Sequence, residues 1–303
     1  MSWLLIALIG PILYAVANHI DKHVIERYLK GGVAGALIIF SSLFSIVALP
    51  VLTYFEPSVL DVTLLQGVYL ALNGMLVVFA FLAYFYALTY DEASYVVPWY
   101  QTIPIFGFIL GYFILGEKIS QTQALASAFI LAGAIILSLD FGGKKMHFKR
   151  EVAFLMLGAS LLYAINGVVF KVIATDAGFW VSVFWGLVGK VILGFAFLAF
   201  IPSYRNQYLY LLRHSGLTVL GFNSLSEFLS MIAEAAMQYV TLLVPVGIAL
   251  LANSFQPFFV LIIGSLIAFF WPSKEAESLR AGKMTQKVVG IAIMVLGSYL
   301  IGV

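Results

Sequence analysis

Long apolar runs, separated by short polar or Pro- and Gly-containing breaks, make up almost all of this 303-residue chain. An α-helix needs about 20 consecutive apolar residues to cross a bilayer. Lipid cannot form the hydrogen bonds that the backbone of an open β-strand needs, and the alternation of apolar and polar residues typical of a membrane β-barrel is not present. We therefore predict ten membrane-spanning helices, at 2–20, 33–54, 64–89, 93–115, 122–140, 152–173, 180–201, 215–240, 243–271 and 285–303.

The composition supports this interpretation and leaves no room for a soluble domain. Hydrophobic residues make up 63% of the chain and charged residues 10%, whereas soluble chains carry about 25% charged residues. The absence of cysteine excludes disulfides and Cys-ligated metals. The net charge of +2 says nothing about nucleic acid, because the basic residues lie in short loops between spans. We expect no nucleic-acid partner and no cofactor. The N-terminal Met1-Ser2-Trp3-Leu4 lacks a basic signal-peptide region, so we expect the first span to be retained.

Two stretches, one in each half, read almost alike. The first half has Leu13-Tyr14-Ala15 followed by Lys22, and the second half has Leu162-Tyr163-Ala164 followed by Lys171 at the same spacing. The spacing from Pro104 to Gly111 likewise recurs from Pro257 to Gly264. A hydrophilic segment at 142–151 separates a first module, 1–141, from a second, 152–303. Because each module has five spans, the second enters the membrane from the opposite side. The predicted fold class is an all-α integral membrane protein with ten transmembrane helices as two five-helix inverted repeats.

A short signature follows the fourth predicted span. Pro104-x6-Gly111-x4-Gly116-Glu117-Lys118-Ile119-Ser120 resembles the EamA-type members of the drug/metabolite transporter superfamily. The resemblance extends over the ten-span plan, but Phe269-Phe270-Trp271-Pro272 stands where the second half would repeat the Gly-Glu step. It implies import or export of small metabolites, often amino acids or drugs. It also makes Glu117 a helix cap at the start of the fifth span.

Three ionisable residues fall in the middle of predicted spans, where charge is costly. Lys190 lies in the seventh span, and Glu227 and Glu234 lie seven residues apart on one face of the eighth. One interpretation is an ion pair that only joins helices. The other is that these residues carry ion or proton coupling, and we favour Glu234 as the carboxyl without a basic partner.

Polar residues beside the matched prolines are candidates for substrate binding. A proline has no N–H, so it leaves a backbone carbonyl without a hydrogen-bond donor at membrane depth, where a ligand can bind. The alternative is that the polar side chains beside it form hydrogen bonds between helices. The polar end of the first span adds further candidates, with an ordinary water-facing span end as its alternative. The predicted substrate-binding residues are Asn18, His19, Trp99, Tyr100, Gln101, Asn253 and Gln256. For Lys22 and Lys171 we expect snorkelling to the interface rather than a gate.

The predicted function is secondary active transport of a small polar or zwitterionic metabolite by alternating access, with possible proton coupling. No Walker motif is present to use ATP directly. One alternative is a flippase for a lipid-linked sugar or polyprenyl phosphate. Another is a membrane-embedded metalloenzyme using His19, Asp21, His23 and Glu26, although we expect no metal and no enzyme activity. The expected partners are a small-molecule substrate and the lipid bilayer, in a monomer or homodimer.

The distribution of Lys and Arg predicts how the chain is oriented. One set of loops holds nearly all of them: Lys22, Arg27, Lys30, Lys144, Lys145, Lys149, Arg150, Arg205, Arg213, Lys274, Arg280, Lys283 and Lys287. The other side holds Lys118, with Lys171 at a span edge. The positive-inside rule places the basic side in the cytoplasm. We therefore expect a cell-membrane (plasma or inner membrane) protein with both termini outside, opposite to the arrangement usual in the resembled family.

Overall fold

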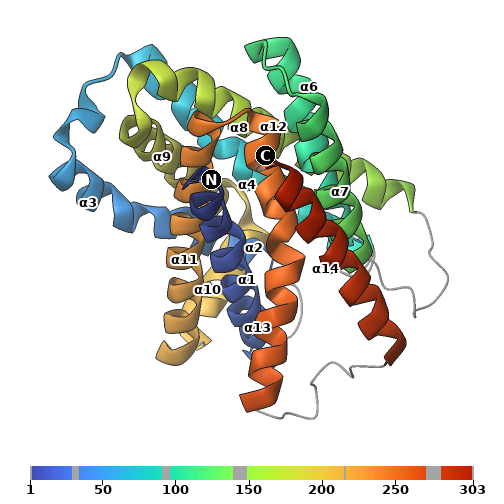
Figure 1. The fold of residues 1–303 in the computed structure, drawn as a ribbon. Coiled ribbons are helices and arrows are strands. Elements are labelled where there is room, and N and C mark those ends of the chain that lie inside the picture. Colours follow the sequence, from blue (N-terminus) through green and yellow to red (C-terminus); the bar gives the residue numbers. More distant parts are fainter. Residues whose placement is uncertain are drawn as a thin grey trace.

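The computed structural model describes residues 2–28, 34–90, 96–138, 149–214, 216–270 and 281–301, and every regular element in these ranges is helical (Figure 1). The α-helices are α1 Ser2–Tyr28, α2 Ala34–Phe44, α3 Ala48–Phe55, α4 Leu64–Tyr90, α6 Ile103–Leu115, α7 Gln121–Ser138, α8 Arg150–Ala177, α9 Phe179–Phe200, α10 Pro202–His214, α11 Leu217–Leu243, α12 Val246–Leu251, α13 Gln256–Phe270 and α14 Ala281–Ile301. Short 3-10 helices are η1 Ser45–Val47, η2 Pro57–Leu60, η3 Val97–Thr102 and η4 Ala252–Phe255.

Within the described residues, seven helical segments are long and apolar enough to cross a membrane, as in an integral membrane protein. They are Trp3–Asp21, Gly35–Phe55, Leu64–Ala87, Val97–Leu115, Arg150–Ala177, Phe179–Phe200 and Val246–Ile267. Gln121–Leu137 and Thr285–Leu300 are apolar but shorter. Helix α11 has the length for a span but carries Asn223, Glu227, Glu234 and Gln238, which lower its hydropathy.

The fourth and ninth apolar runs are each interrupted by a 3-10 turn. Each contains a 3-10 turn directly before a proline-containing helix: η3 precedes Pro104, and η4 precedes Pro257. Proline has no N–H to donate to the carbonyl four residues earlier, so one hydrogen bond of the α-helical ladder is lost at each of these prolines. The bends leave backbone and amide groups at the interior of the bundle.

One helix departs from the sequence-based expectation. Residues 202–214, which the hydropathy pattern leaves between two spans, form α10. It packs on α2 and α9, with Leu211 in a cluster with Val24, Ala36 and Val219. Gln207 accepts a hydrogen bond from the Gly35 N–H at 3.1 Å. A half-apolar helix of this kind is too polar for a span and is stabilised by the bundle end that it covers.

Small residues bring α4 and α9 into close contact. A Cβ on Gly189 would lie 1.9 Å from the Ala71 carbonyl oxygen, and one on Gly74 would lie 2.0 Å from that of Gly186. Only glycine at positions 74 and 189 permits this approach. Helix α7 packs along α14 in the same way, with Gly133 against Met294.

The helices pair in a regular pattern. Helix α1 packs on α11 and α13, and α8 packs on α4 and α6. Helix α2 packs on α9 but touches α11 at only a few positions, in contrast to the close α4–α9 contact. The first and last described residues lie at the same end of the bundle in Figure 1, and α10 lies toward the opposite end.

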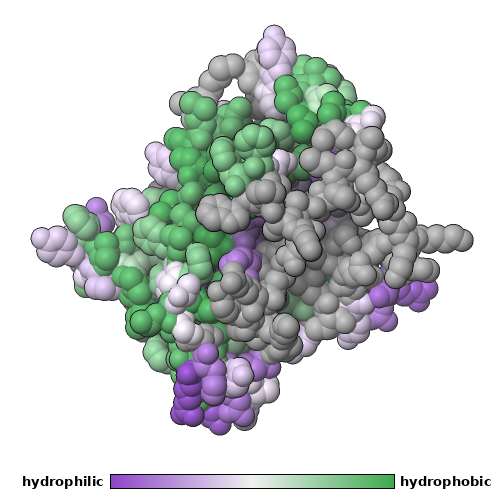
Figure 2. Space-filling model, turned by 90° about the horizontal axis from the view of Figure 1, so that it is seen from below, coloured by the Kyte–Doolittle hydropathy of each residue, from purple (hydrophilic) through white to green (hydrophobic). Residues whose placement is uncertain are grey.

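Seen from the α10 end, the molecule is apolar over much of its visible surface (Figure 2). Hydrophilic residues gather in separate groups toward its edge, and a small hydrophilic area is visible near the centre.

Candidate functional site

A cavity of about 260 Å³ lies among α3, α4, α8, α9 and α11. Much of its lining is apolar, but one part gathers polar side chains from four helices: Asn73, Asn166, Ser182, Lys190, Glu234 and Gln238. Pockets with apolar walls and a few converging polar groups are the usual form of a small-molecule site. We take this cavity as the candidate functional site.

The cavity contains a buried ion pair. Lys190 of α9, which is 9% exposed, pairs through Nζ with Glu234 Oε2 of α11. Gln238, one turn further along α11, donates to Glu234 Oε1 at 3.5 Å. Lys190 and Glu234 are the charged residues among the described cavity lining. Because each compensates the other, removing either would leave an uncompensated charge in a poorly solvated place.

Two asparagines hold α4 and α8 together beside this pair. Asn73 donates from Nδ2 to the Asn166 carbonyl at 3.3 Å, and Asn166 donates from Nδ2 to the Asn73 carbonyl at 3.0 Å. The Asn73 Oδ1 atom is buried and has no hydrogen-bond partner among the described residues. Buried polar atoms are nearly always hydrogen-bonded, so this oxygen is suited to accept a donor from a ligand.

The second carboxylate, Glu227, lies one helical repeat away from Glu234 on α11. Its Oε2 accepts a hydrogen bond from Ser41 Oγ at 2.7 Å. It also interacts electrostatically with Asp21, Lys190 and Glu234. The preference for Glu234 as the carboxyl without a basic partner is therefore wrong: Glu234 is the partner of Lys190, whereas the hydrogen bond to Glu227 comes from the Ser41 hydroxyl.

The polar end of the first span does not converge on one point. His19 Nε2 lies 3.0 Å from the Val260 carbonyl of α13, whereas Asp21 accepts from Ser226 Oγ of α11 at 2.6 Å. The His23 ring meets Phe222 edge-on, and Asn18 is exposed. Among the described residues, no group of three or more His, Cys, Asp or Glu side chains is placed to hold a metal.

The candidate residues beside the prolines lie inside the bundle. Gln101 is 6% exposed, and its Oε1 has no hydrogen-bond partner in the part of the chain that the structure describes. At the matched positions of the second half, the same holds for Asn253 Oδ1 and Ser254 Oγ, and Gln256 is half-buried. The two 3-10 turns thus carry buried amide and hydroxyl groups with unused hydrogen-bonding capacity. They do not belong to the lining of the 260 Å³ cavity.

Aromatic rings connect these turns to the repeated Leu-Tyr-Ala stretches. Tyr100 lies 5.3 Å from Tyr84 and 6.1 Å from Tyr163 between ring centroids, and Trp99 packs on the Val152 and Met156 cluster. Tyr14 and Tyr163 interact with each other and with Glu234. Sequence reasoning did not place these two tyrosines near Glu234, although their matched positions in the two halves were a signal for a shared role.

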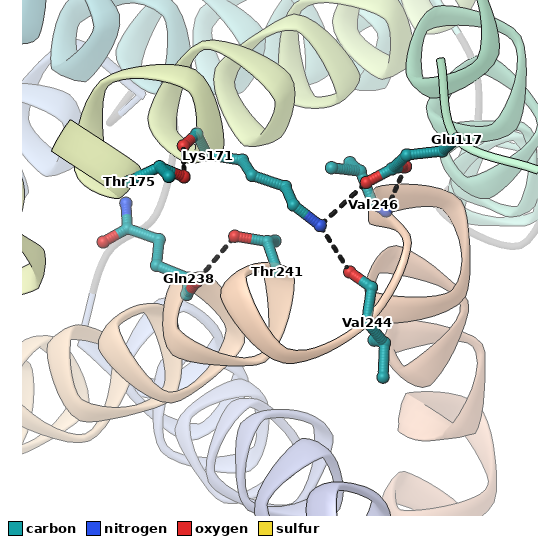
Figure 3. Close-up of polar contacts among 7 residues, drawn as sticks. All are labelled: Glu117, Lys171, Thr175, Gln238, Thr241, Val244 and Val246. Carbon is teal, nitrogen blue, oxygen red and sulfur yellow. Dashed lines mark hydrogen bonds and ion pairs between the residues drawn. The ribbon is translucent and has the colours of Figure 1, made fainter. Parts of the chain in front are cut away.

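A second polar group joins both halves of the chain at the end of the bundle where the described termini lie (Figures 1 and 3). Lys171 Nζ contacts Glu117 Oε1 at 2.7 Å and the Val244 carbonyl at 2.8 Å. Glu117 Oε2 accepts the Val246 N–H at 2.7 Å. We call these four residues the clamp. A crevice of about 430 Å³ beside it is lined by Phe108, Tyr112, Glu117, Lys118, Ile119 and Pro245.

The clamp corrects two expectations from the sequence. Glu117 does not cap α7, which begins four residues later at Gln121; its carboxylate accepts the N–H of Val246, the first residue of α12, instead. A helix start favours a carboxylate there through its unpaired N–H groups. Lys171 does not snorkel to the surface, since its ammonium is held between Glu117 and Val244.

Comparisons with known proteins agree with this picture. The model of the EamA-like transporter family matches residues 1–139. An uncharacterized transporter in the cobO 3'region of Sinorhizobium sp. is 38% identical over 71 residues, which are 23% of this chain and 50% of that protein. The chain thus spans about half the length of this relative. A solved crystal structure of a protein, 15% identical, superposes with a TM-score of 0.61 over 99% of this chain and 98% of its own.

The superposition with that crystal structure shows that the two proteins share a fold along the whole chain. The family model matches the first half. The matched range contains α1 to α7, including the Gly116-Glu117 step that carries the resemblance and the first half's side of the clamp. Residues 1–139 are an EamA-like transporter segment, which confirms the family resemblance predicted from the sequence.

Proposed function

We propose that this protein is a secondary active transporter of a small zwitterionic metabolite, and that the substrate binds between Lys190 and Glu234. The observation that carries the proposal is the ion pair in a polar-lined cavity within an EamA-like membrane protein. A zwitterion such as an amino acid can insert between the two side chains. Its carboxylate then meets Lys190, its ammonium meets Glu234, and Asn73 Oδ1 accepts a further hydrogen bond.

Charge compensation is what selects a zwitterion. An anion bound to Lys190 would strand the Glu234 carboxylate, and a cation bound to Glu234 would strand the Lys190 ammonium, each at a cost of several kcal/mol. A zwitterion exchanges one compensated arrangement for another. A polyprenyl phosphate needs several cationic groups, and Lys190 is the basic residue among the described lining, so this observation favours the zwitterion over the lipid-linked sugar alternative.

The proposal includes a ten-helix architecture of two inverted five-helix repeats, residues 1–141 and 152–303. The helix packing supports it. If α1, α4, α6 and α7 of the first half correspond to α8, α11, α13 and α14 of the second, then the packing of α1 on α11 and α13 is repeated by the packing of α8 on α4 and α6. Helices α7 and α14, which correspond to each other, also pack together. The bends at η3 and η4 then occupy equivalent places, as do Tyr14 and Tyr163.

Alternating access would follow from a difference between two equivalent seams. The α4–α9 seam is closed by direct glycine contacts, whereas the equivalent α2–α11 seam touches at only a few positions. In a symmetric transporter the opposite state has these roles reversed. The clamp joins Glu117 of the first half to α8 and α12 of the second, so we assign it the role of a gate that holds one end shut.

We assign proton coupling to Glu227. The groups around it are Ser41 of α2, Asp21 and Tyr14 of α1, Lys190 of α9 and Glu234 of its own helix. Because Lys190 pairs with Glu234, a proton on Glu227 leaves that ion pair intact. Glu227 can therefore bind and release a proton while the substrate site keeps its charge balance.

Glutamine at position 227 is expected to separate coupling from binding. Glu227→Gln keeps the hydrogen-bonding shape but cannot exchange a proton, so substrate exchange at equal pH should persist while accumulation driven by a pH gradient is lost. Uptake would be measured in proteoliposomes with and without the gradient. Glu56→Gln, at an exposed turn beside Ser58, is the matched control. An unchanged gradient response in Glu227→Gln would remove the proton role.

The matched prolines provide a second expectation. Pro104→Ala and Pro257→Ala each restore a backbone donor and favour continuous helices, which would move Gln101 or Asn253 away from the interior. We expect normal membrane insertion with uptake reduced severalfold in each. Uptake in cells, normalised to the amount of inserted protein, tests this. Full activity in both variants would mean that the bends serve packing alone.

The orientation is proposed from charge: the basic end in the cytoplasm and both termini outside. Arg205 and Arg213 on α10 lie toward the end opposite the described termini in Figure 1, which supports this choice. A reporter active only in the periplasm or outside the cell should work at the C-terminus. If a reporter that works only in the cytoplasm is active at the C-terminus, the orientation is the opposite one, and the clamp lies on the cytoplasmic side.

The metalloenzyme alternative has no geometric support among the described side chains, because His19, Asp21 and His23 contact different neighbours.

A thermal-shift screen of the purified protein tests the proposed substrate class. A ligand at 100 times its Kd adds about 2.7 kcal/mol of stability. We expect amino-acid-like zwitterions to raise the melting temperature, with decarboxylated or N-acylated analogues of the same molecules inactive. Equal shifts from singly charged analogues would contradict the ion-pair site.

A further inference from the structure

The candidate cavity is buried at its polar base and exposed at an apolar edge. Asn166, Ser182 and Lys190 are 7%, 2% and 9% exposed, whereas four lining residues on the other side are far more exposed. These are Val51 at 52%, Trp180 at 46%, Phe228 at 52% and Ile232 at 41%. We call these four residues the rim. The cavity therefore opens past apolar side chains.

The rim residues lie on α3, α9 and α11, and two of them belong to segments long and apolar enough to cross a membrane. Val51 belongs to the Gly35–Phe55 segment and Trp180 to the Phe179–Phe200 segment, while Phe228 lies near the middle of α11. Exposed apolar side chains at this depth meet acyl chains rather than water. The rim includes residues of α3 and α11, next to the loosely packed α2–α11 seam. The cavity that contains the Lys190–Glu234 pair thus has an exposed apolar edge on these helices.

The size of the cavity limits what can enter it. A volume of about 260 Å³ equals the liquid volume of roughly nine water molecules at ~30 Å³ each. This is enough for a compact polar head group but not for an acyl chain as well. A molecule that enters through the rim must leave its apolar part outside, between α3 and α11, where the rim residues and lipid can contact it.

We propose that the cavity also binds a single-chain amphiphile with a zwitterionic head group, which enters from the bilayer through the rim. The ammonium of the head group contacts Glu234, its anionic group contacts Lys190, and the chain passes over Phe228 and Ile232. This rests on the proposed zwitterion site and extends it to lipid-like substrates. We infer a single acyl chain because the rim has one opening, between α3 and α11.

The absence of cysteine makes a direct test practical. Phe228→Cys places one thiol at the rim, and Phe113→Cys on α6, at a residue that is 77% exposed and outside the cavity lining, is its matched control. Each full-length variant would carry a fluorophore in lipid nanodiscs. Lysophosphatidylethanolamine with a brominated chain quenches fluorophores that its chain contacts. We expect saturable quenching at position 228 and weak, linear quenching at position 113.

Head-group selectivity and route are tested in the same system. Brominated lysophosphatidylglycerol, with an anionic head, should quench both positions linearly. Adding Lys190→Met and Glu234→Gln together to the Phe228→Cys protein should abolish saturation. Unlabelled lysophosphatidylethanolamine should compete at least tenfold better than glycerophosphoethanolamine, which has the same head group without a chain. Equal quenching by the two brominated lipids, saturation that survives the double substitution, or equal competition by the chainless compound would each overturn the proposal.

Failure of this proposal is distinguishable from failure of the proposed function. The quenching measures binding from the bilayer and requires no transport. If small zwitterions still stabilise the protein or exchange across liposomes while no saturable quenching occurs, lateral entry is wrong and the zwitterion site stands. If neither occurs, both are wrong.

Discussion

Replacing Lys190 with methionine is expected to abolish substrate exchange and to lower the free energy of unfolding by about 3–5 kcal/mol, since it leaves the Glu234 carboxylate buried without its cation. Methionine keeps the length and apolar stem of lysine, so packing between α9 and α11 changes little. Glu234→Gln should have the same two effects, because it strands the Lys190 ammonium. Exchange in proteoliposomes and thermal unfolding in detergent measure the two effects separately.

The double variant Lys190→Met, Glu234→Gln distinguishes a functional ion pair from a structural one. Replacing both charges leaves nothing uncompensated, and such replacements are often neutral or stabilising. We expect stability within about 1 kcal/mol of wild type with exchange still lost. If the double variant regains both stability and exchange, the pair only joins α9 and α11, and the substrate binds elsewhere.

Breaking the clamp is expected to open one end of the protein. Glu117→Gln keeps an oxygen for the Val246 N–H but removes the negative charge that Lys171 contacts. A single thiol from Thr241→Cys, at a residue that is 2% exposed beside the clamp (Figure 3), reports the opening. Its rate of modification by a water-soluble maleimide should rise about tenfold or more, as expected for a loss of at least 1.4 kcal/mol of closure.

Lys118→Met is the matched control for the clamp, because Lys118 lies in the same loop but is exposed. It should leave the modification rate of Thr241→Cys unchanged. Exchange in Glu117→Gln should fall, because a transporter that does not close one gate loses coupling between its two ends. An unchanged modification rate in Glu117→Gln would show that the clamp is static and that the gate lies elsewhere.

Much of the fold is predictable because it follows from local rules. Apolar runs of membrane length become helices, and Pro104 and Pro257 bend the fourth and ninth runs by removing backbone donors. Helix α10 is missed because hydropathy identifies spans, and a 13-residue helix with a polar face has no span signal. It is held by contacts with α2 and α9, which no local pattern reveals.

The site is predictable in its residue types but not in its pairings. Costly mid-span charges point to Lys190, Glu227 and Glu234, but the two glutamates share a helix face. Which one meets Lys190 depends on how far α9 is displaced along α11, and tertiary packing sets this displacement. The reciprocal Asn73–Asn166 bonds and the Glu117–Lys171 contact also join residues far apart in sequence. No spacing rule connects such positions.

Counterflow tests the central claim most directly. Proteoliposomes containing the purified protein would be loaded with an unlabelled mixture of neutral amino acids and diluted into a trace of the radiolabelled mixture. We predict transient accumulation of label by wild type, and none by the folded Lys190→Met, Glu234→Gln double variant. Accumulation by the double variant equal to that of wild type, or no accumulation by wild type with any zwitterion, would contradict binding between Lys190 and Glu234.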